Sequence, residues 1–309
     1  MIREDLRIVS LLPSATELAC ALGLADQLVG ISHECDYPPE ICAKPVVVHS
    51  ALPVKEMSLG QIDIAVSQQL SQGQSLYVVD EELLRTLAPT HLLTQDLCQV
   101  CAPSGNEVTR VLQALPVAPK ILWMSPHSIA DIHRDLRALA EATGQMVRAD
   151  ELVAQNLSRL KAIAGHFPET LTRPRVFCAE WTDPLYCSGH WVPEQVEIAG
   201  GCDVLGRKWA DSARVSWEQL VEAAPELIVI MPCGFGLAKT KEFALKFLSH
   251  PLAGNMPAVQ QGRVYAVDAA YFSRPGLRVI DGVQLLAHLF HPTIYPWFGS
   301  PAAFIQLKM

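Results

Sequence analysis

The chain has 309 residues, of which half are hydrophobic and 18% are charged, and its net charge is −8. This composition excludes an extensively disordered protein, and the length favours two domains over one. The negative charge argues against nucleic acid as a partner, because binding to phosphates needs clustered Lys and Arg.

Neither the hydropathy nor the start of the chain indicates membrane insertion or export. No apolar stretch approaches the roughly 20 residues that cross a bilayer, so we expect no membrane insertion. The opening segment, Met1–Arg7, shows no apolar region and no cleavage site of a secretory signal, so we expect a cytoplasmic protein. Nine cysteines leave at least one without an internal partner, and in a reducing compartment most of them are expected to be thiols.

Strands and helices alternate along the first half of the chain. Buried strands are predicted at residues 8–12, 28–31, 46–48, 91–94 and 120–123. Pro13 and the capping box Ser14-Ala15-Thr16-Glu17 predict a helix that ends at Gly23, and a further helix is predicted from about Leu59 to Gln72. Two more helices follow, one from the capping box at Ser128 to Gly144 and one that ends at Gly165.

The second half repeats the alternation. Strands are predicted at residues 175–179, 227–230 and 263–267, helices at 193–200, 216–223 and 277–290, and loops at 180–191, 231–236 and 271–276. Strands that alternate with helices predict parallel sheets, in which ligands bind at the carboxyl ends of the strands. The three loops all occupy that position.

One unit occurs in both halves with a constant offset of 136 residues. The helix around Glu82, closed by Pro89 and followed by the strand 91–94, matches the helix around Glu218, closed by Pro225 and followed by the strand 227–230. A repeated helix and strand of this kind indicates two similar lobes.

We therefore predict an α/β fold with two Rossmann-like lobes, each with a parallel sheet, joined by a single long α-helix. The lobes are expected at residues 1–143 and 169–309, with the connecting helix at 144–168 and a ligand cleft between the lobes. A helical connection is stiffer than a coil, so large hinge closure is not expected.

Aromatic residues are concentrated in the loops that follow the strands. Large flat side chains with polar neighbours suit a sizeable, mostly apolar ligand held by a few hydrogen bonds. The six that fall in these loops are Tyr37, Trp181, Trp191, Phe235, Tyr271 and Phe272. Any one of them alone is explained by loop packing, but together they favour a binding function.

The same loops carry candidate metal ligands. Cys98 and Cys101 have the spacing of half a zinc knuckle, and Cys35 and Cys233 are candidates to complete the set with His33 or His190. The alternative is a pair of reduced thiols at a strand end, which we rank first because no second paired motif exists. A thioredoxin-like role is less favoured, since no helix begins at the pair.

Catalytic motifs are missing from the sequence. It contains no GxSxG elbow, no P-loop and no HExxH motif. Asp96, Glu180 and Asp183 are able to do acid–base chemistry, but carboxylates near strand ends are common. Glu82 and Glu218 are explained as favourable charges at helix N-termini, and their equivalence also fits a shared docking role.

The chain resembles the cobalamin-binding branch of the substrate-binding proteins of ABC importers, whose two lobes are joined by one rigid helix. The motifs that carry the resemblance over essentially the whole chain are Val9–Glu17, Ser32–Pro39, the two repeated helices, Thr94-Gln95-Asp96, Gly189–Glu194, Gly200–Leu205, Met231–Phe235 and Arg274-Pro275-Gly276. The resemblance implies the two-lobed fold and a small-molecule ligand. It also implies that Glu82 and Glu218 dock onto an ABC permease.

The resemblance also implies ligand contacts from loops around Tyr37, Asp96, Trp181, Trp191, Phe235 and Phe272. With them we count His33, Glu180, His190, Tyr271 and Arg274 as ligand-binding candidates. His33 or His190 is a candidate axial nitrogen for a chelated metal.

Two functions remain open at this point. The first is a non-catalytic binding protein for a corrinoid, a tetrapyrrole or another metal chelate, with cobalamin as the first candidate. The second is a cytoplasmic metal-dependent enzyme that holds zinc or iron on the Cys/His-rich loops.

Overall fold

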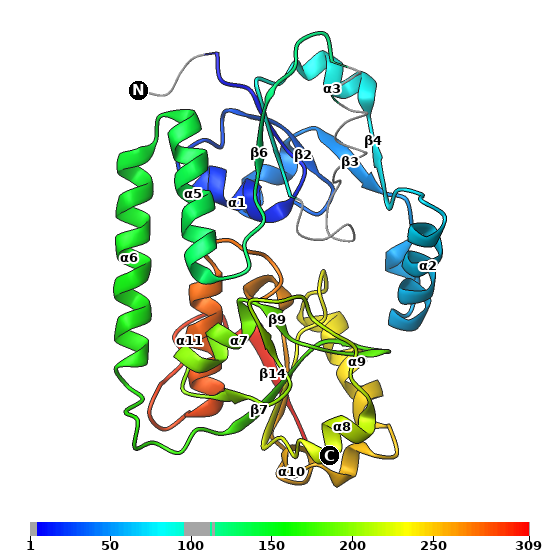
Figure 1. Ribbon diagram of the computed structural model, residues 1–309, viewed down its shortest axis with the longest axis vertical. Helices are drawn as coiled ribbons and strands as arrows, with labels where there is room; N and C mark the ends of the chain where they lie inside the picture. The colour runs from blue at the N-terminus through cyan, green and yellow to red at the C-terminus, as the bar shows by residue number, and fades with distance from the viewer. Residues whose placement is uncertain (1–4, 96–111, 113–114, 309) are drawn as a thin grey trace. The chain divides into compact units, whose positions relative to one another are not determined.

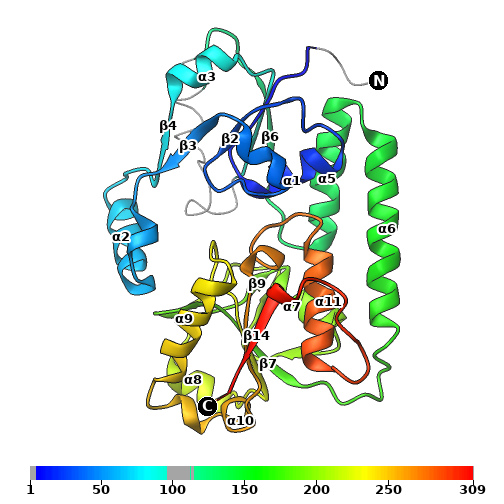
Figure 2. The ribbon, with the colours of Figure 1, turned by 180° about the vertical axis from the view of Figure 1, so that it is seen from behind.

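A computed structural model describes residues 5–95, 112 and 115–308 of the chain (Figures 1 and 2). The chain divides into two compact units. The N-terminal unit comprises Met1–Pro126 and Ala130–Val153, and the C-terminal unit comprises His127–Ile129 and Ala154–Met309. Each unit has its own mainly parallel sheet, which confirms the predicted two-lobed α/β fold. The ligand cleft expected with that fold stays a prediction.

In the described residues, the N-terminal unit is built on a six-stranded sheet in the order β4-β3-β2-β1-β5-β6. Neighbouring strands are parallel, except that β4 runs antiparallel to β3 at the edge. The bounds are β1 Ile8–Ser10, β2 Leu28–Ser32, β3 Val46–Ser50, β4 Tyr77–Val79, β5 His91–Thr94 and β6 Lys120–Trp123. Strands β5 and β6 have the predicted bounds, whereas β4 lies outside every predicted strand.

The helices of this unit are α1 Pro13–Ala21, α2 Leu59–Ser71, α3 Glu81–Leu87 and α5 Ile129–Thr143. The capping box predicted at Ser14 is wrong. Pro13 is already the first helical residue, because its fixed φ and missing N–H suit that position, and Leu12 precedes it without a side-chain cap. Helix α3 packs on the sheet through Leu84, which is buried with Val9, Val47 and Leu92.

The C-terminal unit has a second sheet in the order β10-β7-β12-β13-β14, with β8 paired to β7. Strands β10, β7, β12 and β13 are parallel, while β14 and β8 are antiparallel to their neighbours. A two-stranded parallel sheet of β9 and β11 accompanies it. The bounds are β7 Arg175–Thr182, β8 Leu185–Cys187, β9 Gly189–His190, β10 Cys202–Asp203, β11 Arg207–Lys208, β12 Leu227–Ile230, β13 Val264–Val267 and β14 Phe304–Leu307.

The loop predicted at Glu180–Trp191 is wrong. Strand β7 continues to Thr182 and turns back through β8, with Trp181 opposite Tyr186 and Ala179 opposite Cys187.

Helices cover both faces of the C-terminal sheet. Leu220 of α8, Phe247 of α9 and Val259 of α10 pack on the face that carries Phe177 and Ile228. Helices α7 and α11 pack against each other (Figure 1). The bounds are α7 Val192–Ile198, α8 Trp217–Glu222, α9 Leu237–Leu248, α10 Pro257–Gln260 and α11 Val279–Phe290.

The predicted connecting helix corresponds to α6, Met146–Ala164, which has 19 residues. The division between the two units falls within this helix, after Val153. Its second half is fixed to the C-terminal unit by Arg159, which donates to Asp281 and Gln284 of α11.

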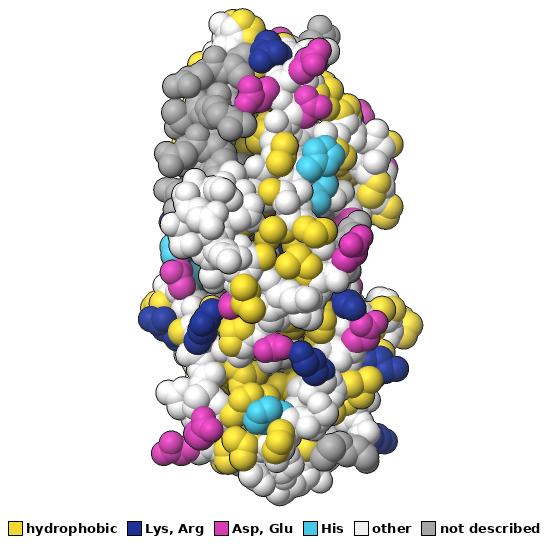
Figure 3. Space-filling model, turned by 90° about the vertical axis from the view of Figure 1, so that its right-hand side faces the viewer, with side chains coloured by type: hydrophobic (Ala, Val, Ile, Leu, Met, Phe, Trp, Pro, Cys, Tyr) yellow, Lys and Arg dark blue, Asp and Glu magenta, His cyan; other side chains and the backbone are white. Residues whose placement is uncertain are grey.

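On the face shown in Figure 3, Lys and Arg side chains are scattered among Asp and Glu rather than gathered into one basic patch.

None of the helices in the described part of the chain has the length and hydropathy needed to cross a membrane.

Candidate functional site

The strand order of the C-terminal unit marks where a ligand is expected. From β7 the chain crosses to β10 on one side and then to β12 on the other, so the direction of the connections reverses between β7 and β12. In open α/β sheets, ligands bind outside the carboxyl ends of the strands at such a point. In the N-terminal unit the same reversal lies between β1 and β5.

Two predicted aromatic residues meet beside this point in the C-terminal unit. Trp181, near the end of β7, and Phe235, after β12, have ring centroids 6.0 Å apart, and both side chains are half-buried. Glu180 accepts a hydrogen bond from the main-chain N–H of Gly189 at 2.9 Å, and the N–H of Cys233 is bonded to the carbonyl of Glu180 at 3.3 Å. The pair offers a partly exposed apolar surface on a backbone fixed by these bonds.

Two other predicted aromatic residues belong to the core. Trp191 is 5% exposed and Phe272 is 1% exposed. The indole N–H of Trp191 donates to the carbonyl of Phe272 at 2.7 Å. Both residues therefore hold the segment after β13 against α7, and neither ring presents a surface for a ligand.

Tyr271 and Arg274 lie beside this buried pair and are half-buried. Tyr271 lines a cavity of about 310 Å³ with Asp281 and Gln284 of α11 and the segment 295–299. The carbonyl of Tyr271 accepts a hydrogen bond from the side chain of Gln195 at 3.2 Å.

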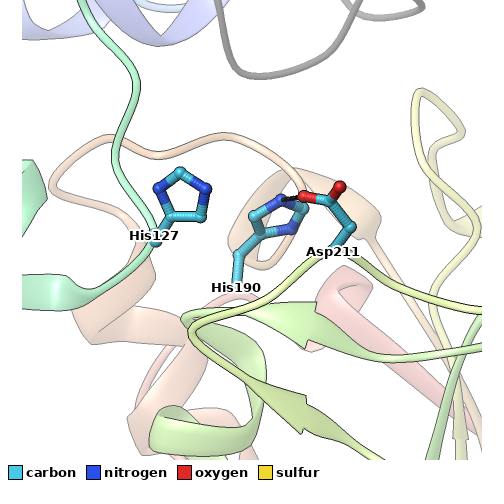
Figure 4. A group of neighbouring side chains, drawn as sticks. All are labelled: His127, His190 and Asp211. Atoms are coloured by element: carbon cyan, nitrogen blue, oxygen red, sulfur yellow. Dashed lines mark hydrogen bonds and ion pairs between the residues drawn. The ribbon is translucent and has the colours of Figure 1, made fainter.

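The predicted site residue His190 lies close to a carboxylate and to a second imidazole. Its Nε2 lies 3.2 Å from Oδ1 of Asp211, and its ring centroid lies 5.6 Å from that of His127 (Figure 4). All three residues belong to the C-terminal unit. Burial lowers the pKa of His190 below its usual value, Asp211 opposes this and His127 adds to it, so the imidazole is held towards its neutral form.

Sequence reasoning missed His127 and Asp211. His127 immediately precedes the residue identified as a helix cap, and Asp211 follows the short strand β11, which no pattern predicts. Only the pairing of β9 with β11 brings Asp211 to His190, and a two-residue strand carries no periodic signal.

In the N-terminal unit, His33 and Tyr37 follow β2. The Nδ1 of His33 lies 3.1 Å from the carbonyl of Val48, and its ring stacks on His49 with centroids 6.3 Å apart. Tyr37 is exposed. The predicted ligand residue Asp96 and the predicted metal ligands Cys98 and Cys101 lie outside the described residues.

The other two predicted cysteine ligands belong to different units. Cys35 is buried in the N-terminal unit, where its thiol lies 3.1 Å from Oγ1 of Thr16, and Cys233 is exposed in the C-terminal unit. In the described part of the chain, the one group of three metal-ligand side chains is His127, His190 and Asp211, and it includes neither cysteine. None of the seven described cysteines forms a disulfide.

Glu82 and Glu218 occupy equivalent places. Each is the second residue of its helix, after an N-cap, Asp80 or Ser216, whose side chain accepts a bond from the N–H three residues on. Both carboxylates are exposed. Hydrogen bonds from the helix start, chiefly its own main-chain N–H, lower the pKa of Glu218 below its usual value.

Comparison with known proteins gives one family. The family model described as "Periplasmic binding protein" matches residues 71–271. Among curated proteins, the ABC transporter substrate-binding lipoprotein YvrC of Bacillus subtilis is 26% identical over 302 residues, which cover 95% of this chain and 82% of that protein. A vitamin B12-binding protein of Vibrio cholerae is 24% identical over 284 residues, which cover 90% of this chain and 86% of that protein.

Solved structures show the same fold. A periplasmic heme-binding protein from Pseudomonas aeruginosa superposes with a TM-score of 0.73 at 18% sequence identity, and the match covers 100% of both chains. At this identity the likeness concerns the fold alone.

Proposed function

Because the chain belongs to the periplasmic binding protein family, we propose that it binds a metal-chelating small molecule of the corrinoid or tetrapyrrole type, with cobalamin as the first candidate. The observation that carries the proposal is the half-buried pair of Trp181 and Phe235 at the strand reversal of the C-terminal unit. The vitamin B12-binding relative supports cobalamin as the chemistry to test first.

The surroundings of this pair suit a large, partly apolar ring. Aromatic faces bind flat apolar surfaces, while fixed polar groups orient the ligand. The carboxylate of Glu180 is already fixed by Gly189, and the exposed thiol of Cys233 lies on the adjacent strand end. Tyr37 and His33 are candidates within the N-terminal unit.

Visible absorbance tests the proposal, because corrinoids and haems change their spectra when an axial ligand or the polarity around the ring changes. The full chain is titrated with cobalamin and, in parallel, with haem. We expect a change that saturates at one ligand per chain for one of the two. A spectrum that stays unchanged for both, together with no heat of binding, contradicts the proposal.

We further propose that the chain docks onto an ABC permease through Glu82 and Glu218. The support is their equivalent position at two helix starts and the family of the chain. Charge reversal by Glu82→Arg with Glu218→Arg should abolish binding to a purified permease of the same organism and leave ligand binding intact. Glu222→Arg, at the other end of α8, is the matched control, and equal loss with the control contradicts the docking role.

A further inference from the structure

The function proposed above does not depend on the group formed by His127, His190 and Asp211. One ligand atom from each residue lies within 4.8 Å of the others. Two imidazole nitrogens and one carboxylate oxygen form a donor set that suits Zn²⁺ and its neighbours in the transition series better than Mg²⁺ or Ca²⁺. We propose that these three side chains bind a divalent transition-metal ion.

The backbone around His190 approaches the segment 210–212 closely, and this brings Asp211 next to His190. At Gly189, a Cβ would lie 2.3 Å from the N of Ser212 and 2.7 Å from the O of Ala210, so only glycine permits this approach. Two main-chain hydrogen bonds fix it: His190 donates to Ala210 at 2.7 Å, and Trp209 donates to His190 at 2.9 Å.

His190 itself has a left-handed backbone, with φ of 52°. For a residue with a side chain this conformation costs about 1–3 kcal/mol. The pair that it forms with Asp211 does not repay that cost, because Asp211 is 76% exposed and such pairs contribute at most about 1 kcal/mol. This backbone conformation directs the imidazole towards Asp211 and His127.

His127 is held on the other side of the group. Two residues on, the main-chain N–H of Ile129 donates to the carboxylate of Glu194 at 3.0 Å, which fixes this segment to α7. The ring of His127 is tilted by 44° to that of His190 and is not stacked on it. Figure 4 shows the two imidazoles and the carboxylate on neighbouring segments.

The distances suit an ion after a small side-chain movement. A tetrahedral zinc site places ligand atoms about 3.4 Å apart, because each bond is about 2.1 Å long. The atoms of His190 and Asp211, at 3.2 Å, already have that separation. A nitrogen of His127 lies within 4.8 Å of the other two ligand atoms, so each separation has to shorten by no more than about 1.4 Å to complete the set. Three protein ligands leave one position open to water or to a donor atom of another molecule.

The test uses the full chain without an affinity tag, stripped of metal with EDTA, and measures Zn²⁺ by equilibrium dialysis and Co²⁺ by visible absorbance. We expect one ion per chain at this site. Asp211→Asn and His127→Gln should each weaken its binding by at least about 100-fold, more than the loss of a supporting hydrogen bond outside the ligand set. Asp211 is exposed, so its variant tests the site even where a variant of His190 fails to fold.

Two controls separate this site from others. His49→Gln removes an exposed imidazole of the N-terminal unit and should leave binding unchanged. Cys98→Ser with Cys101→Ser should likewise retain the ion, and Co²⁺ should show no thiolate charge-transfer band. The proposal is overturned if the wild-type chain binds no ion, or if both site variants leave the binding unchanged. A thiolate band that the cysteine variant removes also overturns it. None of these outcomes bears on cobalamin binding, which is measured separately.

Discussion

Ala88 and Ala224 have the same left-handed backbone, with φ of 40° and 42°, and they lie 136 residues apart. Ala88 is the C-cap of α3, and Ala224 follows the C-cap of α8. The strands that follow, His91–Thr94 and Leu227–Ile230, start and stop at the same offset. The repeat in the sequence therefore corresponds to one local structure that occurs in both units.

Glycine should stabilise the chain at these helix ends. Left-handed backbone costs an L-residue about 1–2 kcal/mol, and glycine does not have this cost. We expect Ala224→Gly to raise the free energy of unfolding of the C-terminal unit by about 1 kcal/mol, measured by urea unfolding. Ala223→Gly is the control, because Ala223 has φ of −63° and should lose stability instead. A loss at both positions contradicts this explanation.

Arg159 should contribute more to the stability of the chain than an ordinary surface arginine does. Its guanidinium donates to both Asp281 and Gln284 and joins α6 to α11. The side chain is 34% exposed, so solvent screens the pair in part, and we expect Arg159→Ala to destabilise the chain by about 1 kcal/mol. Arg137→Ala removes a more exposed pair with Asp150 and should change the stability by less than about 0.5 kcal/mol. Equal effects of the two variants contradict this assignment.

The carboxyl of Asp203 makes the stability of the folded chain depend on pH. Burial raises the pKa of its carboxyl to about 6, although Ser188, Gly206 and Leu205 donate to it, and Glu197 adds to the increase. The folded chain thus holds this proton more tightly than the unfolded chain, and its stability falls as the pH rises from about 4 to about 6.

Asp203→Asn removes this titration. The free energy of unfolding of the variant minus that of the wild type should increase by about 2 kcal/mol between about pH 4 and about pH 6. Above this range the difference should stay constant. The measurement is urea unfolding of both chains at several pH values. A difference that does not change with pH, or that shrinks as the pH rises, contradicts the assignment.

Trp181 tests where the ligand binds. Because its half-buried ring pairs with Phe235, we expect Trp181→Ala to weaken the binding of cobalamin or haem by about tenfold. Leu157→Ala, which removes an apolar side chain that is 54% exposed on α6, should leave the affinity unchanged. Unchanged affinity in the Trp181 variant would place the ligand at another site.

Much of the fold could be predicted from the sequence, because long apolar runs and proline-closed helices are local signals. Strand 227–230 is buried at all four positions, as a continuous apolar run predicts for a parallel strand. Strands β4 and β14 at the sheet edges are short and form by antiparallel pairing with distant residues, so no local pattern indicates them. Helix α1 begins at Pro13 and not at the capping pattern that follows, because proline suits the first helical position.

The candidate site was harder to predict. A loop residue and a core residue look alike in sequence when both are aromatic, so the sequence alone does not distinguish Trp191 and Phe272 from Trp181 and Phe235. The hydrogen bond between Trp191 and Phe272 joins residues 81 positions apart, and only the fold shows it. The same holds for His190 and Asp211, which the pairing of β9 with β11 brings together.

The most direct test of the proposed function is native mass spectrometry of the full chain mixed with cobalamin or haem. The account predicts a new species heavier than the free chain by the mass of one ligand molecule, at ligand concentrations where an unrelated control protein stays unbound. Free chain alone with both ligands, or adducts of increasing number with no preferred stoichiometry, would contradict it.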